Sequence, residues 1–149
     1  MDESRVRGGT IEDIPAWVTL ASEVEPLFGP MPDIESNIRR AIERGTALVV
    51  TDANDDLIGG AMLSRDDRPH HIHWLAVSGN ARRQGAGRAL VRAILARWDD
   101  GRPVDVITFG ADVPGGEPAR ALYTTCGFSF TEHREPGPEG GSRERWTRH

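Results

Sequence analysis

The chain has 149 residues, of which 38% are hydrophobic and 28% are charged, and it carries a formal net charge of −5 at pH 7. Its length and composition are typical of a globular protein, and we expect a single domain over residues 1–149. Nucleic-acid-binding proteins are normally basic, so the negative net charge argues against nucleic acid as a partner.

Residue usage excludes further classes. All 18 basic residues are arginines, whereas a Walker-type nucleotide hydrolase and a Schiff-base enzyme each require a lysine. The single cysteine, Cys126, excludes an internal disulfide and fits a reducing compartment. No apolar run approaches the roughly 18 residues of a membrane span, and the start of the chain lacks the apolar stretch of a signal peptide. We therefore expect a cytoplasmic protein without a membrane partner.

Charge is unevenly distributed along the chain. Residues 1–67 carry 14 acidic and 6 basic side chains, a net charge of −8, whereas residues 68–149 carry 9 acidic and 12 basic ones, a net charge of +3. This difference has two alternative explanations. Either the charges are ordinary solvated surface, or an anion-binding half of the protein faces a half that attracts cations.

In chain order, residues 4–10 have the pattern of a short strand. Thr10 then precedes apolar residues at helical spacing and has Asp13 three positions later, close to a capping box. This pattern predicts a helix over residues 10–28, which "GPMP" ends. A second helix is predicted over residues 33–45, where Gly45 ends it.

The next apolar segments, residues 46–51 and 57–63, flank the polar turn "DANDD" and predict a β-hairpin. A strand at residues 71–77 follows, and then the most regular amphipathic helix of the chain, at residues 87–98. The remaining elements are expected at residues 104–109 (strand), 117–126 (helix), 128–133 (strand) and 143–148 (strand). The order predicts a mixed α/β domain around one central sheet.

The stretch "RRQGAGRAL", residues 82–90, places two glycines and three arginines where a helix begins. Free backbone N–H groups and the positive end of the helix dipole meet at such a position, and Gly85 and Gly87 allow an anion to approach the backbone. Arg82, Arg83 and Arg88 supply charge-assisted contacts to phosphate. The turn therefore suits a pyrophosphate, although "GAGRAL" lacks the third glycine of the dinucleotide fingerprint.

Two motifs carry a resemblance to a known family. "WLAVSGNARRQGAGRALV" resembles the acetyl-CoA-binding segment of the GNAT superfamily of N-acetyltransferases, whose hallmark [Arg/Gln]-x-x-Gly-x-[Gly/Ala] matches Arg82, Gly85 and Gly87. "ARALYTTCGF", residues 119–128, resembles the family's A-x-x-L-Y-x-x-x-G-F segment. The resemblance implies a GNAT fold, with a central twisted, mostly antiparallel sheet of six to seven strands flanked by about four helices.

The same resemblance implies acetyl-CoA as cosubstrate, with no metal. Leu75, Ala76 and Val77 would pair their backbone with the pantetheine arm, and the Val77 amide would polarise the thioester carbonyl. The pyrophosphate would lie on the turn formed by Arg82, Arg83, Gln84, Gly85, Ala86, Gly87 and Arg88.

The implied reaction is direct transfer of an acetyl group to a primary amine in a ternary complex. Tyr123 matches the family tyrosine that protonates the departing thiolate; the alternative is a core tyrosine. His73 occupies the position of the family's usual glutamate base, and a mostly neutral histidine can accept the amine proton. The alternative is a histidine that fills the face of the sheet. His71 and His73 share a strand face, but no third metal ligand at suitable spacing is evident.

The acceptor is expected on the segment "EVEPLFGPMPD", which is the substrate side of GNAT folds. Glu23, Glu25 and Asp33 would attract a cationic amine, while Phe28 and Met31 would form an apolar wall.

Gly116 departs from the family pattern, because it replaces an asparagine often found seven residues before the tyrosine. Gly116 and the atypical His73 support a second hypothesis, a GNAT-fold protein that binds acyl-CoA or regulates without turnover. The incomplete glycine fingerprint supports a third, an unrelated nucleotide-binding α/β domain. We expect the acceptor to be a small-molecule or peptide amine, and the resemblance to the family adds the expectation of a homodimer.

Overall fold

The computed structural model of the chain describes residues 5–65 and 70–149, apart from the side chains of residues 82–84. The described residues form a seven-stranded sheet in the order β1-β2-β3-β4-β5-β7-β6. The strands are β1 (Val6–Gly8), β2 (Ala47–Thr51), β3 (Leu57–Leu63), β4 (His70–Val77), β5 (Val104–Phe109), β6 (Ser129–Arg134) and β7 (Arg143–Arg148). The helices are α1 (Ile14–Phe28), α2 (Ile34–Arg44), α3 (Ala86–Arg97) and α4 (Glu117–Thr125), with 3-10 turns η2 (Ile11–Asp13) and η3 (Gly79–Gln84).

All neighbouring strands are antiparallel except β4 and β5, which are parallel. The elements appear in the order that the sequence patterns predict. The prediction of a mixed α/β fold with a mostly antiparallel sheet and about four helices is confirmed.

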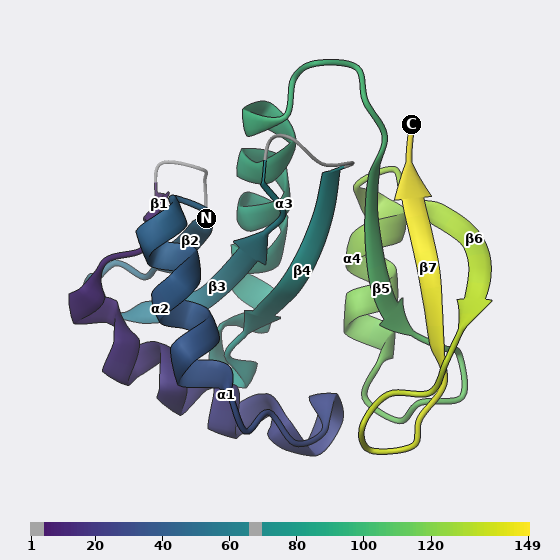
Figure 1. The fold of residues 1–149 in the computed structure, drawn as a ribbon, viewed down its shortest axis with the longest axis horizontal. Helices are drawn as coiled ribbons and strands as arrows, with labels where there is room; N and C mark the ends of the chain where they lie inside the picture. Colours follow the sequence, from purple (N-terminus) through teal and green to yellow (C-terminus); the bar gives the residue numbers. More distant parts are fainter. Residues whose placement is uncertain (1–4, 66–69) are drawn as a thin grey trace.

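Helices cover both faces of the sheet (Figure 1), with α1 and α2 in front and α3 and α4 behind. On the α1–α2 face, Trp17 and Ile38 are completely buried against β2 and β3. On the other face, Leu90 and Ile94 of α3 are completely buried in the larger hydrophobic cluster. The two clusters hold the sheet between them and fix β4 in its middle.

The capping prediction at Thr10 is confirmed, although η2 precedes α1. The Asp13 carboxylate accepts a hydrogen bond from the Thr10 backbone N–H at 2.8 Å and forms an ion pair with Arg7 at 2.8 Å. The hydrogen bond from Arg7 holds the pKa of Asp13 below its ordinary value. This carboxylate therefore links β1 to the start of the first helix.

Candidate active site

A β-bulge lies in the middle of β4. Met62 of β3 pairs with Trp74, and Leu63 pairs with Ile72, so His73 is an extra residue on β4. The register between β4 and β5 runs from His70 to Ile72 and, within the described residues, ends at the bulge. Bulges bend a strand and redirect its side chains, and they often occur next to active sites.

A cavity of about 790 Å³ lies along the edge of β4 beyond the bulge. We call it the β4–α4 cavity, because Leu75, Ala76 and Val77 line one wall and Tyr123 lines the other. Gly85, Gly87 and Arg88, from the turn before α3 and its first residues, also line it. The tertiary structure thus brings together the strand, the glycine turn and the tyrosine of the two sequence motifs.

The backbone of β4 has free polar groups on the side of this cavity. The Ser78 N–H donates to Ile58 O of β3 at 2.8 Å, and successive residues of an antiparallel strand direct their N–H and C=O groups to alternate sides. Leu75 and Val77 therefore point these groups away from β3. An unpaired strand edge of this kind can pair with an extended ligand, as with an added strand.

The turn before α3 and the start of this helix contain one glycine in the left-handed region and one that is closely packed. Gly85 has φ of +80° and directly precedes α3, in the left-handed region where a side chain is strained. Gly87 packs closely, because a β-carbon there would lie 3.0 Å from Leu122 Cδ2. The Ala86 side chain is buried in the core, so only its backbone could reach a ligand. The side chains of Arg82, Arg83 and Gln84, predicted to bind the cofactor, lie outside the described residues.

Glu23 supports the same turn. Its carboxylate accepts hydrogen bonds from the Gly79 N–H at 2.6 Å and from the Ser78 hydroxyl at 3.0 Å. We expected Glu23 to attract an amine, whereas these contacts give it a structural role at the end of β4.

Tyr123 is buried at 4% relative exposure, and its ring packs edge-on against Phe128. Burial, reinforced by the nearby Cys126 thiol, raises the pKa of the phenol above its ordinary value. The phenol therefore stays protonated at neutral pH, as a proton donor must.

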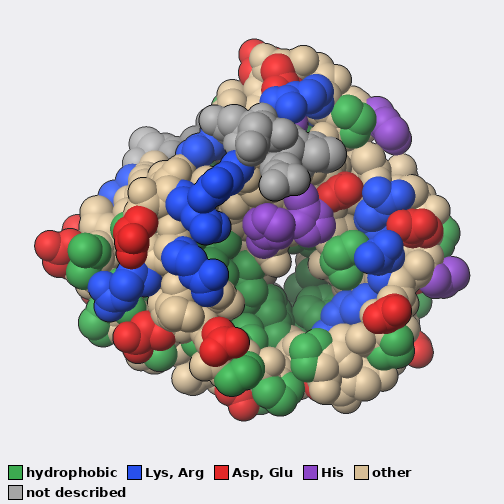
Figure 2. All heavy atoms as spheres, in the orientation of Figure 1, with side chains coloured by type: hydrophobic (Ala, Val, Ile, Leu, Met, Phe, Trp, Pro, Cys, Tyr) green, Lys and Arg blue, Asp and Glu red, His purple; other side chains and the backbone are tan. Residues whose placement is uncertain are grey.

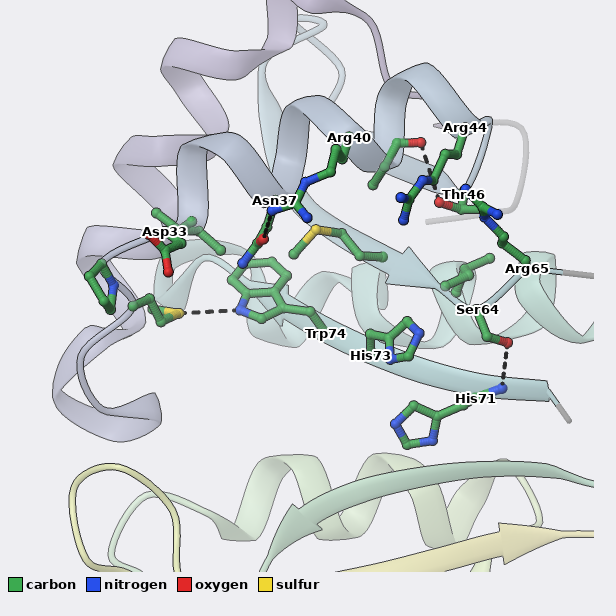
Figure 3. Close-up of a pocket in the computed structure, with 16 residues that line it drawn as sticks. Asp33, Asn37, Arg40, Arg44, Thr46, Ser64, Arg65, His71, His73 and Trp74 are labelled. Carbon is green, nitrogen blue, oxygen red and sulfur yellow. Dashed lines mark hydrogen bonds between the residues drawn. The ribbon is translucent and has the colours of Figure 1, made fainter. Parts of the chain in front are cut away.

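A second cavity, of about 850 Å³, lies on the α1–α2 face of the sheet. We call it the α2–β4 cavity, because it runs from α2 to β4 (Figure 3). His71, His73 and Trp74 all line it. Strict alternation would send residues 73 and 74 to opposite faces, and the bulge is the reason that both face this cavity.

His73 lies in a chain of titratable groups. Its ring is 4.8 Å from that of His71, centroid to centroid, which confirms that the two histidines share a face. His71 Nδ1 in turn hydrogen-bonds Asp105 of β5. Burial and the charge of His71 lower the pKa of His73, while Asp105 opposes the shift. His73 is therefore neutral at neutral pH and can accept a proton.

The residues that we expected to bind the acceptor do not all lie in one cavity. Met31 and Asp33 line the α2–β4 cavity, and Met31 Sδ accepts a hydrogen bond from Trp74 Nε1 at 3.4 Å. Phe28 instead lines the β4–α4 cavity. Glu25 is exposed and lines neither cavity, because it lies on the outer side of α1.

The model of the acetyltransferase (GNAT) family matches residues 14–128, which include both motifs and both cavities. The chain belongs to the GNAT acetyltransferase family. Its members are acyltransferases that use acetyl-CoA. Curated protein sequences contain no match to the chain.

Solved structures support the GNAT fold. A GNAT-family acetyltransferase from Bacillus cereus is 18% identical with a TM-score of 0.74, and the match covers 95% of this chain and 94% of that one. The ribosomal-protein-S18-alanine N-acetyltransferase from Escherichia coli is 20% identical with a TM-score of 0.73, covering 96% and 91%. A chain of the NatC complex bound to Gag peptide and CoA is 15% identical with a TM-score of 0.74, covering 96% of each chain.

Close packing at Gly116 leaves no room for the side chain of the family asparagine. A β-carbon on Gly116 would lie 2.7 Å from Phe109 Cβ, so a larger residue there requires Phe109 to move. Phe109 lines the β4–α4 cavity and packs edge-on against Phe28, with centroids 5.6 Å apart. Sequence reasoning missed Phe109, although its place at the end of a strand parallel to β4 is a signal that could have identified it.

Among residues 5–65 and 70–149, no group of three or more His, Cys, Asp or Glu side chains is placed to hold a metal ion. No helix in this part of the chain has the length and apolar character to cross a membrane.

Proposed function

We propose that this protein transfers an acetyl group directly from acetyl-CoA to the primary amine of an acceptor bound beside it. One observation carries the proposal: consecutive residues of β4 line two separate cavities, Trp74 the α2–β4 cavity and Leu75 the β4–α4 cavity. Two substrates bound in these neighbouring cavities would meet beside the bulge at His73. Such proximity is a large part of the catalysis of bimolecular reactions.

The β4–α4 cavity fits acetyl-CoA. The free N–H and C=O groups of Leu75 and Val77 match the amides of the pantetheine arm. The left-handed Gly85 and the exposed Arg88 suit the pyrophosphate. Bound acetyl-CoA supplies the acetyl group as an activated thioester.

Three groups of this chain would act on the reactants. The Val77 N–H would donate to the thioester oxygen as negative charge develops there. His73 would accept the proton that the amine nitrogen loses as its bond to the acetyl carbon forms. Tyr123 would give a proton to the sulfur as the carbon–sulfur bond breaks, and that proton is later restored from solvent.

Calorimetric titration with acetyl-CoA, CoA, dephospho-CoA, NAD and ATP tests the proposal, followed by a CoA-release assay with a panel of amines. We expect micromolar binding limited to the CoA compounds and CoA release that depends on an amine. CoA binding without release by any amine would instead support a binding or regulatory protein. Preference for NAD or ATP would refute the assignment of the β4–α4 cavity.

A further inference from the structure

One side of the α2–β4 cavity is basic. Arg40 and Arg44 of α2 and Arg65, which follows β3, line it, and Asp33 is the single acidic lining side chain among the described residues. Figure 2 shows arginine side chains beside the histidines that border the central hollow of this face. These three are half of the six basic residues in the first 67 positions, a segment with a net charge of −8.

The arginines of this cavity have no carboxylate partner within residues 5–65 and 70–149. Among the described residues, Arg40 donates a hydrogen bond to Asn37 Oδ1, at 2.8 Å. By contrast Arg39, one residue earlier and outside the cavity, forms an ion pair with Glu35 at 3.9 Å. Two arginines four positions apart on a helix repel each other, so the pair Arg40 and Arg44 is one that a bound anion would stabilise.

Asp33 lies far from the Arg44 end of this cluster. Eleven residues of helix separate it from Arg44, which corresponds to about 16 Å at a rise of about 1.5 Å per residue. That separation exceeds the screening length in physiological salt, about 8 Å. Figure 3 shows Asp33 at one end of the cavity and Arg44 and Arg65 at the other.

The remaining walls of the cavity include the proposed base. His73 and Trp74 form the β4 side of the cavity, opposite α2, and Met31 and Met62 add apolar surface. An acceptor with its amine at His73 has its far end beside Arg40 and Arg44.

We propose that the acceptor carries an anionic group, a carboxylate or a phosphonate-like group, which Arg40, Arg44 and Arg65 bind. The inference rests on the proposed acetyl transfer and names the substrate class of its acceptor cavity. Arginine binds both kinds of anion in bidentate geometry. It differs from our expectation from sequence, in which Glu23, Glu25 and Asp33 attract a cationic amine.

Matched pairs of acceptors test the substrate class, since the members of a pair differ mainly in the anion. L-phenylalanine is compared with 2-phenylethylamine, and 3-aminopropylphosphonate with propylamine, by CoA release. We expect kcat/KM to be at least about tenfold higher for the anionic member of one pair. The pair that shows the difference identifies carboxylate or phosphonate as the preferred group.

Variants test whether the arginines are responsible. R40Q/R44Q is expected to lower kcat/KM for the anionic acceptor by about tenfold or more, mainly through KM, and to leave the neutral amine within about twofold. R39Q is the matched control, because it removes a charge from the same helix outside the cavity. Equal activity on both members of each pair, or no effect of R40Q/R44Q, would overturn the inference.

A binding measurement separates this inference from the proposed transfer. N-acetyl-L-phenylalanine and N-acetyl-3-aminopropylphosphonate, which keep the anion, are titrated into the CoA complex of the wild type and of R40Q/R44Q. Binding that R40Q/R44Q loses, without acetylation of any amine, would support the anion site and refute the transfer. Acetylation of neutral amines, without binding of either product, would support the transfer and refute the anion site. Absence of both would overturn the inference.

Discussion

At the scale of single residues, Tyr123 and His73 owe their proposed roles to opposite shifts of proton affinity. Burial keeps the phenol of Tyr123 protonated, whereas burial and the charge of His71 keep the His73 imidazole neutral. A donor that holds its proton and an acceptor that lacks one are what an acyl transfer to an amine requires.

We expect Tyr123→Phe to lower kcat by at least about tenfold, because the proton donor for the thiolate is lost. Acetyl-CoA affinity should stay within about twofold, because the ring and its packing against Phe128 remain. Rapid-quench kinetics and calorimetry measure the two quantities. A wild-type kcat would exclude Tyr123 as the acid.

His73→Gln should change the pH dependence of kcat/KM. As pH falls, protonation of the acceptor amine already lowers kcat/KM. Below the pKa of His73, protonation of the histidine lowers kcat/KM further, so that two protonations contribute to the slope. Because that pKa lies under the ordinary value, the steeper slope should begin below about pH 6.5.

The variant is expected to keep the single-proton slope throughout the acidic range. His133→Gln is the control, since His133 lies on β6 and lines neither cavity. If the steep slope persists in His73→Gln, another group is the base.

At the scale of elements, the bulge in β4 and the turn before α3 create the site. The bulge turns His73 and Trp74 to one face and leaves Leu75 and Val77 facing the other cavity. The turn at Gly85 then starts α3 with its free N–H groups at the same edge.

Two glycine variants separate ligand binding from backbone strain. Gly85 has φ of +80° and Gly101 has φ of +79°, but only Gly85 lines the β4–α4 cavity. Replacing either with alanine should lower the free energy of unfolding by about 1–2 kcal/mol. Only Gly85→Ala should weaken acetyl-CoA binding, by about tenfold or more, because its methyl group meets the ligand.

Urea denaturation and calorimetry on both variants check this expectation. Equal affinities for acetyl-CoA in Gly85→Ala and Gly101→Ala would mean that the turn does not contact the ligand.

At the scale of the whole molecule, the sheet has two parts that meet along a short register. Strands β1 to β4 form one part and β5 to β7 the other, and their parallel pairing joins His70–Ile72 to Val104–Val106. Beyond this register, the β4–α4 cavity separates β4 from α4 and the end of β5. A ligand in this cavity would contact both parts.

Acetyl-CoA should therefore stabilise the fold. At one hundred times its Kd the ligand adds about 2.7 kcal/mol, which corresponds to a rise in Tm of roughly 5–10 °C for a domain of this size. Differential scanning fluorimetry measures the shift, with NAD at the same concentration as control. Equal shifts with both ligands would contradict binding through the CoA-specific contacts.

Much of this architecture is predictable from the sequence, because its signals are local. Apolar spacing, turn residues and glycines determine where each helix and strand begins and ends. The motif around Gly85 and the segment around Tyr123 together indicate the family. Those features depend on a few neighbouring residues, which the sequence displays directly.

Tertiary structure alone decided which residues share a cavity. The pairing of Met62 and Leu63 with β4 makes His73 a bulge, and packing of Phe109 excludes a side chain at Gly116. Likewise, Arg44 and Arg65 are far apart in the sequence and come together only when α2 packs beside β3. Strand register and helix packing depend on contacts between distant segments, and one inserted residue changes which face every later side chain occupies.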